Sequence, residues 1–299
     1  MKKFLNNRKV VPYVFCLPFI LMFVIVFLYP AITAVMMSFQ KVDTFSGAAT
    51  WNNFSNYKKL FGDSHFWVAF KNTLIYTCVS LALNVPLSLL IANMLNSKLM
   101  GGKLSNVFRS VLFLPTLTSA VVAGIVFRLA FSAQPDGVMN RIIGLFGLEP
   151  FGWLTTQSGQ FISLAILNIW LNLGINVVYY LSGLQSIPTE MYEAADLDGA
   201  SATQKFFHLT LPLLKPTSVY VMTMSILAGF SMFTESHVLW NGNFAGDKGL
   251  TIVAYLYQNG FRKNNFGYAA TVGIVLMLLV LAVNLVQMFF NGSFKKEGN

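Results

Sequence analysis

Three asparagines recur at every fourth position inside a long apolar stretch: Asn168, Asn172 and Asn176. Side chains four residues apart lie on one face of a helix, so these amides form a polar stripe. Each amide can both donate and accept hydrogen bonds, which suits the hydroxyl groups of a sugar. Polar groups are costly within a membrane, and we predict that this stripe lines the path of a polar solute. Hydrogen bonds between helices, worth about 1 kcal/mol each, explain the stripe equally well.

Aromatic and polar side chains near this stripe are further candidates for the same path. We assign Trp170 and Tyr180 to neighbouring faces of the helix, where an aromatic ring can stack on the C–H face of a sugar. Weaker candidates stand at the end of the next apolar stretch: Phe230, Ser231, Thr234 and Glu235. Glu235 also has a simpler explanation, in which its carboxylate reaches the outer membrane surface.

Residue types that carry out catalysis form no recognisable site in this sequence. The three histidines, His65, His208 and His237, are scattered and do not make the HExxH spacing of a zinc enzyme. The segment 101–103 (GGK) lacks the upstream glycine and the following hydroxyl of a phosphate-binding loop. We expect no catalytic residue, metal site or cofactor on this chain, and any ATP hydrolysis on another polypeptide.

The composition indicates which elements carry these residues. Of 299 residues, 55% are hydrophobic and only 10% are charged, which is typical of a membrane protein rather than a soluble domain. A helix needs about 20 apolar residues to cross a bilayer, and each long uncharged stretch holds one such segment. We predict an all-α polytopic membrane protein with a single domain, residues 1–299. Its six predicted transmembrane helices cover about 10–39, 70–96, 107–131, 161–183, 216–240 and 269–290.

Basic residues determine the expected orientation. The net charge of +9 would suggest nucleic acid in a soluble protein, but here basic residues crowd both terminal tails and the loop near Lys103. Basic residues favour the cytoplasmic side of a membrane, so we expect cytoplasmic termini and no nucleic-acid partner. The first apolar stretch is too long for a cleavable signal peptide and lacks a small-residue cleavage site. Cys16 and Cys78 fall inside predicted helices and indicate neither a disulfide framework nor a metal site.

A polar loop, residues 190–216, interrupts the apolar pattern between two predicted spans. Good helix formers over 191–197 predict a short helix, and Gly199 permits a sharp turn after it. Ser201 is a suitable N-cap for a second helix that runs to about His208. The loop therefore offers a carboxylate and apolar side chains to a partner outside the lipid. A pair of interfacial helices that only fills the loop is the simpler alternative.

The spacing of residues within this loop resembles a known signature. Glu193-Ala194-Ala195, then Asp198-Gly199-Ala200, then Phe206 and Leu211-Pro212, resemble the EAA loop of binding-protein-dependent ABC importer permeases. The flanking segments LQSIP (184–188) and LPLLKP (211–216) resemble the carbohydrate branch, the maltose-type membrane subunits. The resemblance implies that the loop docks into a groove of a separate ATPase subunit. The coupling residues would be Glu193, Ala194, Ala195, Asp198, Gly199 and Phe206.

Other segments are similar to the same family. Residues 51–63 contain its NF..Y..L pattern, which predicts a short amphipathic surface helix, and Asn72 is expected to bond to backbone at the start of the second span. Residues 137–147 resemble its G..N..L...G segment, and 250–270 resemble its aromatic segment before the last span. The exit from the fifth span, 240–243, lacks the proline and the second glycine that relatives commonly carry there.

The resemblance implies a type I ABC importer permease fold and a role in sugar or oligosaccharide import across a bacterial or archaeal plasma membrane. The expected partners are a second homologous permease, two ATPase subunits that hold ATP and magnesium, and an extracellular or periplasmic solute-binding protein. A permease for another polar solute, such as glycerol phosphate, is the alternative within this class. A secondary transporter is less well supported, because intramembrane charge is sparse and no inverted repeat is evident. A membrane-bound enzyme lacks a recognisable site.

Overall fold

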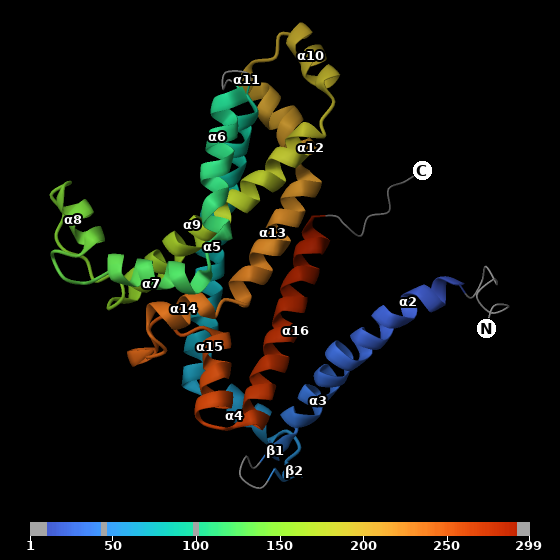
Figure 1. The fold of residues 1–299 in the computed structure, drawn as a ribbon, viewed down its shortest axis with the longest axis vertical. Helices are drawn as coiled ribbons and strands as arrows, with labels where there is room; N and C mark the ends of the chain where they lie inside the picture. Colours follow the sequence, from blue (N-terminus) through green and yellow to red (C-terminus); the bar gives the residue numbers. More distant parts are fainter. Residues whose placement is uncertain (1–10, 43–46, 98–101, 292–299) are drawn as a thin grey trace. The chain divides into compact units, whose positions relative to one another are not determined.

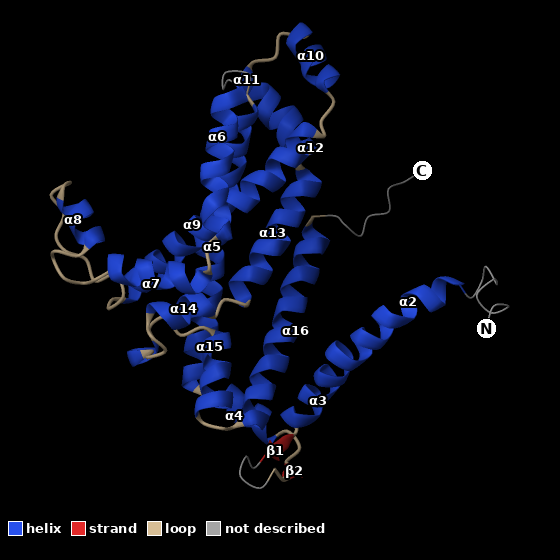
Figure 2. Ribbon diagram, viewed as in Figure 1, coloured by secondary structure: helices blue, strands red, loops and turns tan. Residues whose placement is uncertain are grey.

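The structure is a computed structural model that describes residues 11–42, 47–97 and 102–291; of Val11 only the backbone is described. Helices dominate these ranges, and two short strands, β1 (Gln40–Val42) and β2 (Ala49–Trp51), pair as an antiparallel hairpin (Figure 2). The chain forms two compact units, 1–63 with 256–277 and 64–255 with 278–299. The basic tails and the loop at 98–101, which the expected orientation depends on, lie outside the described residues.

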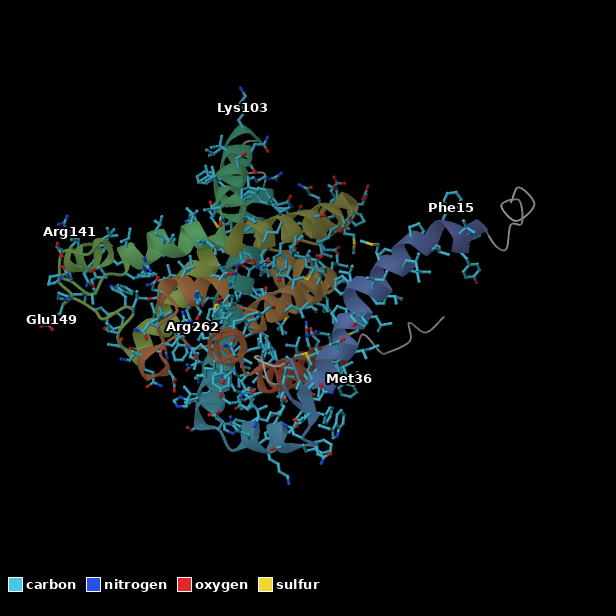
Figure 3. The ribbon with its side chains drawn as sticks, turned by 60° about the horizontal axis from the view of Figure 1, so that its bottom comes forward. Phe15, Met36, Lys103, Arg141, Glu149 and Arg262 are labelled. Atoms are coloured by element: carbon cyan, nitrogen blue, oxygen red, sulfur yellow. The ribbon has the colours of Figure 1, made fainter. Side chains whose placement is uncertain are left out.

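The first unit begins with a long helical stretch. It consists of α2 (Val11–Met22), the π-helical segment η1 (Phe23–Leu28) and α3 (Tyr29–Ser38). None of the residues in its most apolar window is buried, and Figure 3 shows side chains such as Phe15 projecting from the ribbon. A helix that is apolar on all sides needs lipid or another apolar surface around it. The stretch therefore has the properties of a membrane span.

Close contacts to backbone hold the rest of this unit. Asn56 of α4 (Ser55–Phe61) is buried and donates from Nδ2 to the Gln40 carbonyl at 3.0 Å. The start of α16 (Phe266–Phe290) approaches the same strand so closely that a Cβ at Gly267 would meet the Gln40 carbonyl oxygen. The helix expected over 51–63 therefore forms, but it is shorter than predicted and is anchored through a polar residue. The unit also contains the π-helical segment η5 (Gln258–Arg262).

Three long helices pack together in the second unit: α5 (Ser64–Asn96), α9 (Gln157–Gln185) and α13 (Lys215–Phe230) (Figure 1). Glycines allow the backbones to approach, because a Cβ at Gly229 of α13 would lie 2.5 Å from the Thr77 hydroxyl of α5. A Cβ at Gly174 of α9 would meet the backbone carbonyl of Leu112. Small residues at helix contacts are typical of membrane proteins.

Apolar side chains of this unit bury in two clusters. One cluster joins α5, α9 and α13; Tyr180 and Leu214 are among its fully buried members, and the partly buried Tyr192 packs against it. The other contains Tyr76 of α5 and Trp153, which precedes α9. Because lipid tails are as apolar as these cores, van der Waals packing rather than the hydrophobic effect holds such clusters together within a membrane.

The third predicted span, over 107–131, consists of two helices instead of one. A bend of 96° separates the stretch 102–117 from α7 (Ala120–Ala130). Pro115 lies in the short 3-10 turn η2, and Thr118 is extended, with ψ 136°. A proline and an extended residue both interrupt the helical hydrogen-bond ladder, which explains the break. The first part of the stretch is α6 (Gly102–Phe113) followed by η2 (Leu114–Leu117).

The fifth predicted span, over 216–240, also divides. The helix α13 ends at Phe230, and after a turn α14 (Thr234–Leu239) packs against α7. On its other side α13 is bent by 66° from the helical stretch 202–213. Pro216 lies in the first turn of α13, where the missing N–H of a proline has no intrahelical partner to lose.

Among the described residues, four helices are long and apolar enough to cross a membrane: 12–38, 64–96, 157–185 and 266–290. The count rises to six if each of the two bent pairs, 102–130 and 202–230, makes one span. The helical content and these spans agree with the predicted class, an all-α polytopic membrane protein.

Buried amides fix the connections of the second unit. Asn140 of α8 (Val138–Gly144) accepts a hydrogen bond from Trp153 Nε1 at 2.8 Å. Asn72 does not bond at the start of its own helix as expected, because α5 begins eight residues earlier, at Ser64. Its amide donates to the Asp247 carbonyl at 3.0 Å and so holds a loop distant in sequence. This loop contains η4 (Ala245–Asp247) and leads into α15 (Ile252–Tyr257).

Candidate functional site

A polar cavity of about 180 Å³ lies between α5, α9 and α13. None of the described residues that line it carries a charge. Its apolar lining comes from Ile175, Met224 and Ala228. Its polar lining consists of amides and hydroxyls, from Ser80, Asn84, Asn168, Asn172, Asn176, Tyr179 and Ser225. Such a wall can donate and accept hydrogen bonds from an uncharged, hydroxyl-rich solute.

All three asparagines of the predicted stripe line this cavity. Asn176 is buried and donates from Nδ2 to Oδ1 of Asn84 on α5, at 3.3 Å. Asn84 donates in turn from Nδ2 to Oδ1 of Asn168, at 3.4 Å. Asn172 donates instead to the backbone carbonyl of Asn168 on its own helix, at 3.1 Å. The stripe therefore takes part in hydrogen bonds between helices and also forms a cavity wall.

The aromatic candidates on α9 lie outside the cavity lining. Trp170 contacts Phe127 of α7 with ring centroids 5.4 Å apart. Trp170 is two residues from both Asn168 and Asn172, which corresponds to about 200° around a helix. Its ring therefore points away from the stripe and does not lie on a neighbouring face as expected. Tyr180 continues the stripe by one turn but is fully buried in the apolar cluster of α5, α9 and α13.

The candidates near the end of the fifth predicted span do not reach this cavity either. Phe230 is buried, and the Ser231 hydroxyl donates back to the Leu227 carbonyl. Thr234 and Glu235 stand in the first turn of α14, beyond the end of α13. The polar contribution of α13 comes from Ser225.

The wall that α5 provides was not predicted from the sequence. Ser80 and Asn84 both line the cavity and are both buried. A signal for them exists, because Tyr76, Ser80 and Asn84 repeat at four-residue spacing just as the asparagines of α9 do. Serine and threonine are common in membrane helices for packing alone, which makes this signal weaker than a run of asparagines.

The polar loop forms a second candidate site, and its first helix is α10 (Thr189–Leu197). Gly199 follows with φ +75°, and its N–H bonds to the Asp196 carbonyl at 3.1 Å. The next N–H, of Ala200, bonds to the Ala195 carbonyl at 2.9 Å. These two bonds make the Schellman motif, in which a glycine in the left-handed region ends a helix. The turn predicted at Gly199 is confirmed.

The predicted cap of the second loop helix is also confirmed. Ser201 Oγ accepts from the Gln204 N–H at 3.3 Å, and Gln204 Oε1 accepts from the Ser201 N–H at 2.8 Å, which is a capping box. The helix runs beyond His208, through a π-helical segment. Such segments recur at functional sites. Its parts are α11 (Ala202–Gln204), η3 (Lys205–Thr210) and α12 (Leu211–Leu213).

Side-chain contacts tie the two loop helices to each other and to the long helices. Asp196 of α10 forms an ion pair with Lys205 of η3. The Tyr192 hydroxyl bonds to the Thr210 hydroxyl at 2.9 Å. The Tyr192 ring also packs against the apolar cluster of α5, α9 and α13. A displacement of α10 therefore has a contiguous packed route to these helices.

The residues predicted to couple to an ATPase divide between an open surface and two hollows. Ala194 and Asp198 are exposed, while Ala195 lines a hollow of about 320 Å³. Glu193 and Phe206 line a second hollow of about 590 Å³. The Glu193 side chain is exposed, and the described part of the chain shows no ion pair to it. Its carboxylate is thus free to meet a basic group from outside this chain.

Comparison with known proteins gives consistent matches. The family described as "Binding-protein-dependent transport system inner membrane component" matches residues 84–296. The arabinooligosaccharides transport system permease protein AraP of Bacillus subtilis (strain 168) is 46% identical over 292 residues, 98% of this chain and 92% of that protein. The sn-glycerol-3-phosphate transport system permease protein UgpA of Yersinia pestis is 30% identical over 93% of each chain.

A solved structure resembles the whole fold. It is the crystal structure of a bacterial ABC transporter involved in the import of the acidic polysaccharide alginate. One of its chains matches with a TM-score of 0.79 and 25% sequence identity, over 97% of this chain and 98% of that one. The likeness over nearly the full length confirms the predicted fold class, that of an ABC importer permease.

Proposed function

Because this chain belongs to the family of binding-protein-dependent transport system inner membrane components, we propose that it is a permease subunit of an ATP-driven importer of a neutral oligosaccharide. The family match and the AraP relative support import of a saccharide. The match to an alginate importer supports the same class of solute, although alginate is acidic.

One observation carries the choice of a neutral saccharide, namely the uncharged lining of the cavity between α5, α9 and α13. A phosphate or carboxylate group is normally met by arginine, lysine or a helix N-terminus. The amides and hydroxyls that line this cavity instead match sugar hydroxyls, which both donate and accept hydrogen bonds. Glycerol phosphate is therefore the less favoured solute for this chain, despite the UgpA relative.

The size of the cavity supports a second permease subunit. Sites for small molecules usually measure about 300–1,000 Å³, whereas this cavity measures about 180 Å³. One chain therefore provides part of a saccharide site, and a homologous chain that faces it would provide the rest.

The loop 190–216 is the proposed docking element for a separate ATPase pair, with the loop and both termini in the cytoplasm. Glu193, Ala194, Ala195, Asp198, Gly199 and Phe206 are the proposed coupling residues. ATP and magnesium belong to those subunits, since this sequence lacks a phosphate-binding loop. Closure of the ATPase pair would move α10, and Tyr192 would transmit that movement to the long helices. A solute-binding protein on the outer side would deliver the saccharide.

The test is transport by the whole complex. An affinity tag on this chain would allow purification of the complex from its host and reconstitution into vesicles with the binding protein. Arabinotriose, an acidic alginate trisaccharide and glycerol 3-phosphate would be offered separately, with uptake and ATP hydrolysis measured. We expect ATP-dependent uptake of arabinotriose and little of the two anions. Preferred uptake of either anion would overturn the neutral assignment, and uptake of none of the three would count against saccharide import.

A further inference from the structure

We propose that α5 supplies two residues of the saccharide path: Ser80, whose hydroxyl contacts the solute, and Asn84, which orients the amides of α9. The proposal rests on the proposed function and adds a second helix to the site. Both residues line the cavity, and their side chains are 6% and 2% exposed. Neither belongs to the asparagine stripe of α9.

Asn84 occupies the middle of a chain of amides that runs in one direction. Its Oδ1 accepts from Asn176 at 3.3 Å, and its Nδ2 donates to Asn168 at 3.4 Å. The Asn176 amide thereby keeps its oxygen for the cavity, and the Asn168 amide keeps its N–H groups for the cavity and the nearby Tyr76 hydroxyl. Asn84 thus determines which of its two neighbours presents an acceptor and which presents a donor. A sugar hydroxyl, which is both donor and acceptor, can bridge such a pair.

Ser80 provides an independent observation. Its Oγ is buried and makes no hydrogen bond of ordinary length and angle among the described residues. The Tyr76 hydroxyl, one turn earlier on the same face, also lacks such a bond, although it is close enough to interact with Ser80 and Asn168. Buried polar groups without a partner are rare, because burial removes the hydrogen bonds that water would make. A hydroxyl that is unsatisfied and also lines a polar cavity is explained if a solute or its water completes the bond.

Ser88 shows what a serine with a packing role looks like on this helix. It lies one turn beyond Asn84 on the same face and is fully buried. Its hydroxyl donates to the Val85 carbonyl of its own helix at 2.9 Å, and it is not part of the cavity wall. Ser88 is therefore a matched control for both proposed residues.

The first experiment replaces Ser80 by alanine in the reconstituted complex, with arabinotriose as the probe. Removal of an unsatisfied buried hydroxyl should leave the melting temperature unchanged or slightly raised. The KM for arabinotriose should rise about fivefold, the equivalent of a lost hydrogen bond of about 1 kcal/mol. Ser88→Ala should leave KM unchanged. An unchanged KM in Ser80→Ala, or a lowered melting temperature as its main effect, would assign Ser80 a packing role.

The second experiment is a double-mutant cycle between Asn84→Ala and Asn168→Ala. If Asn84 acts by orienting Asn168, each single variant raises KM, and the double variant is hardly worse than Asn168→Ala alone. Purely structural roles would instead lower the amount of assembled complex and leave KM unchanged. If the effects of the two single variants on KM, expressed as free energies, add fully in the double variant, the proposal is also contradicted. A wild-type complex that takes up no arabinotriose would count against the proposed function itself, and the melting temperatures would then still report on Ser80.

Discussion

At the scale of single residues, the three asparagines of α9 do different things. Asn176 is buried and bonds to Asn84 across the helix interface, so it stabilises the contact of α9 with α5. Asn172 is half-buried, and its one side-chain hydrogen bond to the described residues goes to the backbone of its own helix. The two explanations of the stripe that the sequence left open can therefore be tested on different members. Asn172 is the member whose amide is least committed to protein contacts.

We predict that Asn172→Ala alters transport without impairing assembly. Loss of its amide removes no bond between helices, so the melting temperature of the complex should change little. A saccharide would lose one hydrogen bond, and KM for arabinotriose or the preference among sugars should shift about fivefold. Uptake kinetics over several sugars, with Asn176→Ala as a comparison that lowers stability, would measure this. If Asn172→Ala takes up every sugar with unchanged kinetics, its amide is structural.

The sequence predicted correctly that the three asparagines share one face, because a single helix decides that position. The four-residue spacing of the asparagines required no knowledge of neighbouring helices, and all three line one cavity. Trp170 and Tyr180 were predicted beside them, but Trp170 packs against Phe127 of α7, and Tyr180 is buried in the apolar cluster of α5, α9 and α13. Which helix covers a given face depends on packing between distant segments, and a single sequence does not contain that information directly.

At the scale of elements, local signals predicted the loop helices well. A capping serine, a glycine after the first helix and good helix formers between them act within a few residues, and each is present as expected. The break of the third span near Pro115 was not predicted, because prolines are tolerated inside membrane helices when neighbours satisfy the freed carbonyls. Only the packed structure shows that the helix bends here.

We predict that Glu193→Lys and Gly199→Asp each abolish transport by weakening the contact with the ATPase, while the spans still insert. Lysine would reverse the charge of an exposed side chain in the docking element. Aspartate tolerates the left-handed φ of +75° better than most residues, so its main changes at this turn are an added charge and an added side chain. Co-purification of the ATPase should fall at least about tenfold, equivalent to about 1.4 kcal/mol.

Gly199→Asn separates the charge from the added side chain in the second variant. Asparagine matches aspartate in shape and in its tolerance of the left-handed region but carries no charge, and a Cβ at Gly199 meets no described atom within 4 Å. We therefore expect Gly199→Asn to retain more of the ATPase than Gly199→Asp does. If both charged variants keep the ATPase bound and hydrolysis coupled to uptake, the loop is not the coupling element.

At the scale of the whole molecule, large apolar side chains stay exposed over much of the chain. Phe15 of α2 is 80% exposed and Phe290 of α16 is 82% exposed. Exposed apolar area of this extent marks a surface that meets lipid or another protein. Lipid covers such side chains without any further binding partner, whereas the proposed saccharide site would be completed by the proposed second permease. The bilayer and that permease would then cover different parts of the surface.

The last prediction concerns the orientation of the chain in the membrane. If the loop 190–216 is cytoplasmic, a cysteine introduced by Ala202→Cys should react with an impermeant maleimide only in inverted vesicles. Asn243 is exposed beyond the other end of α13, so Asn243→Cys should react in intact cells. The helix between them has 16 residues, about 24 Å in length. Both tests need a background in which Cys16 and Cys78 are replaced, because both are exposed thiols. Labelling of the cysteine at position 202 in intact cells would contradict this topology, because the loop would then lie outside the cell, where no ATPase can reach it.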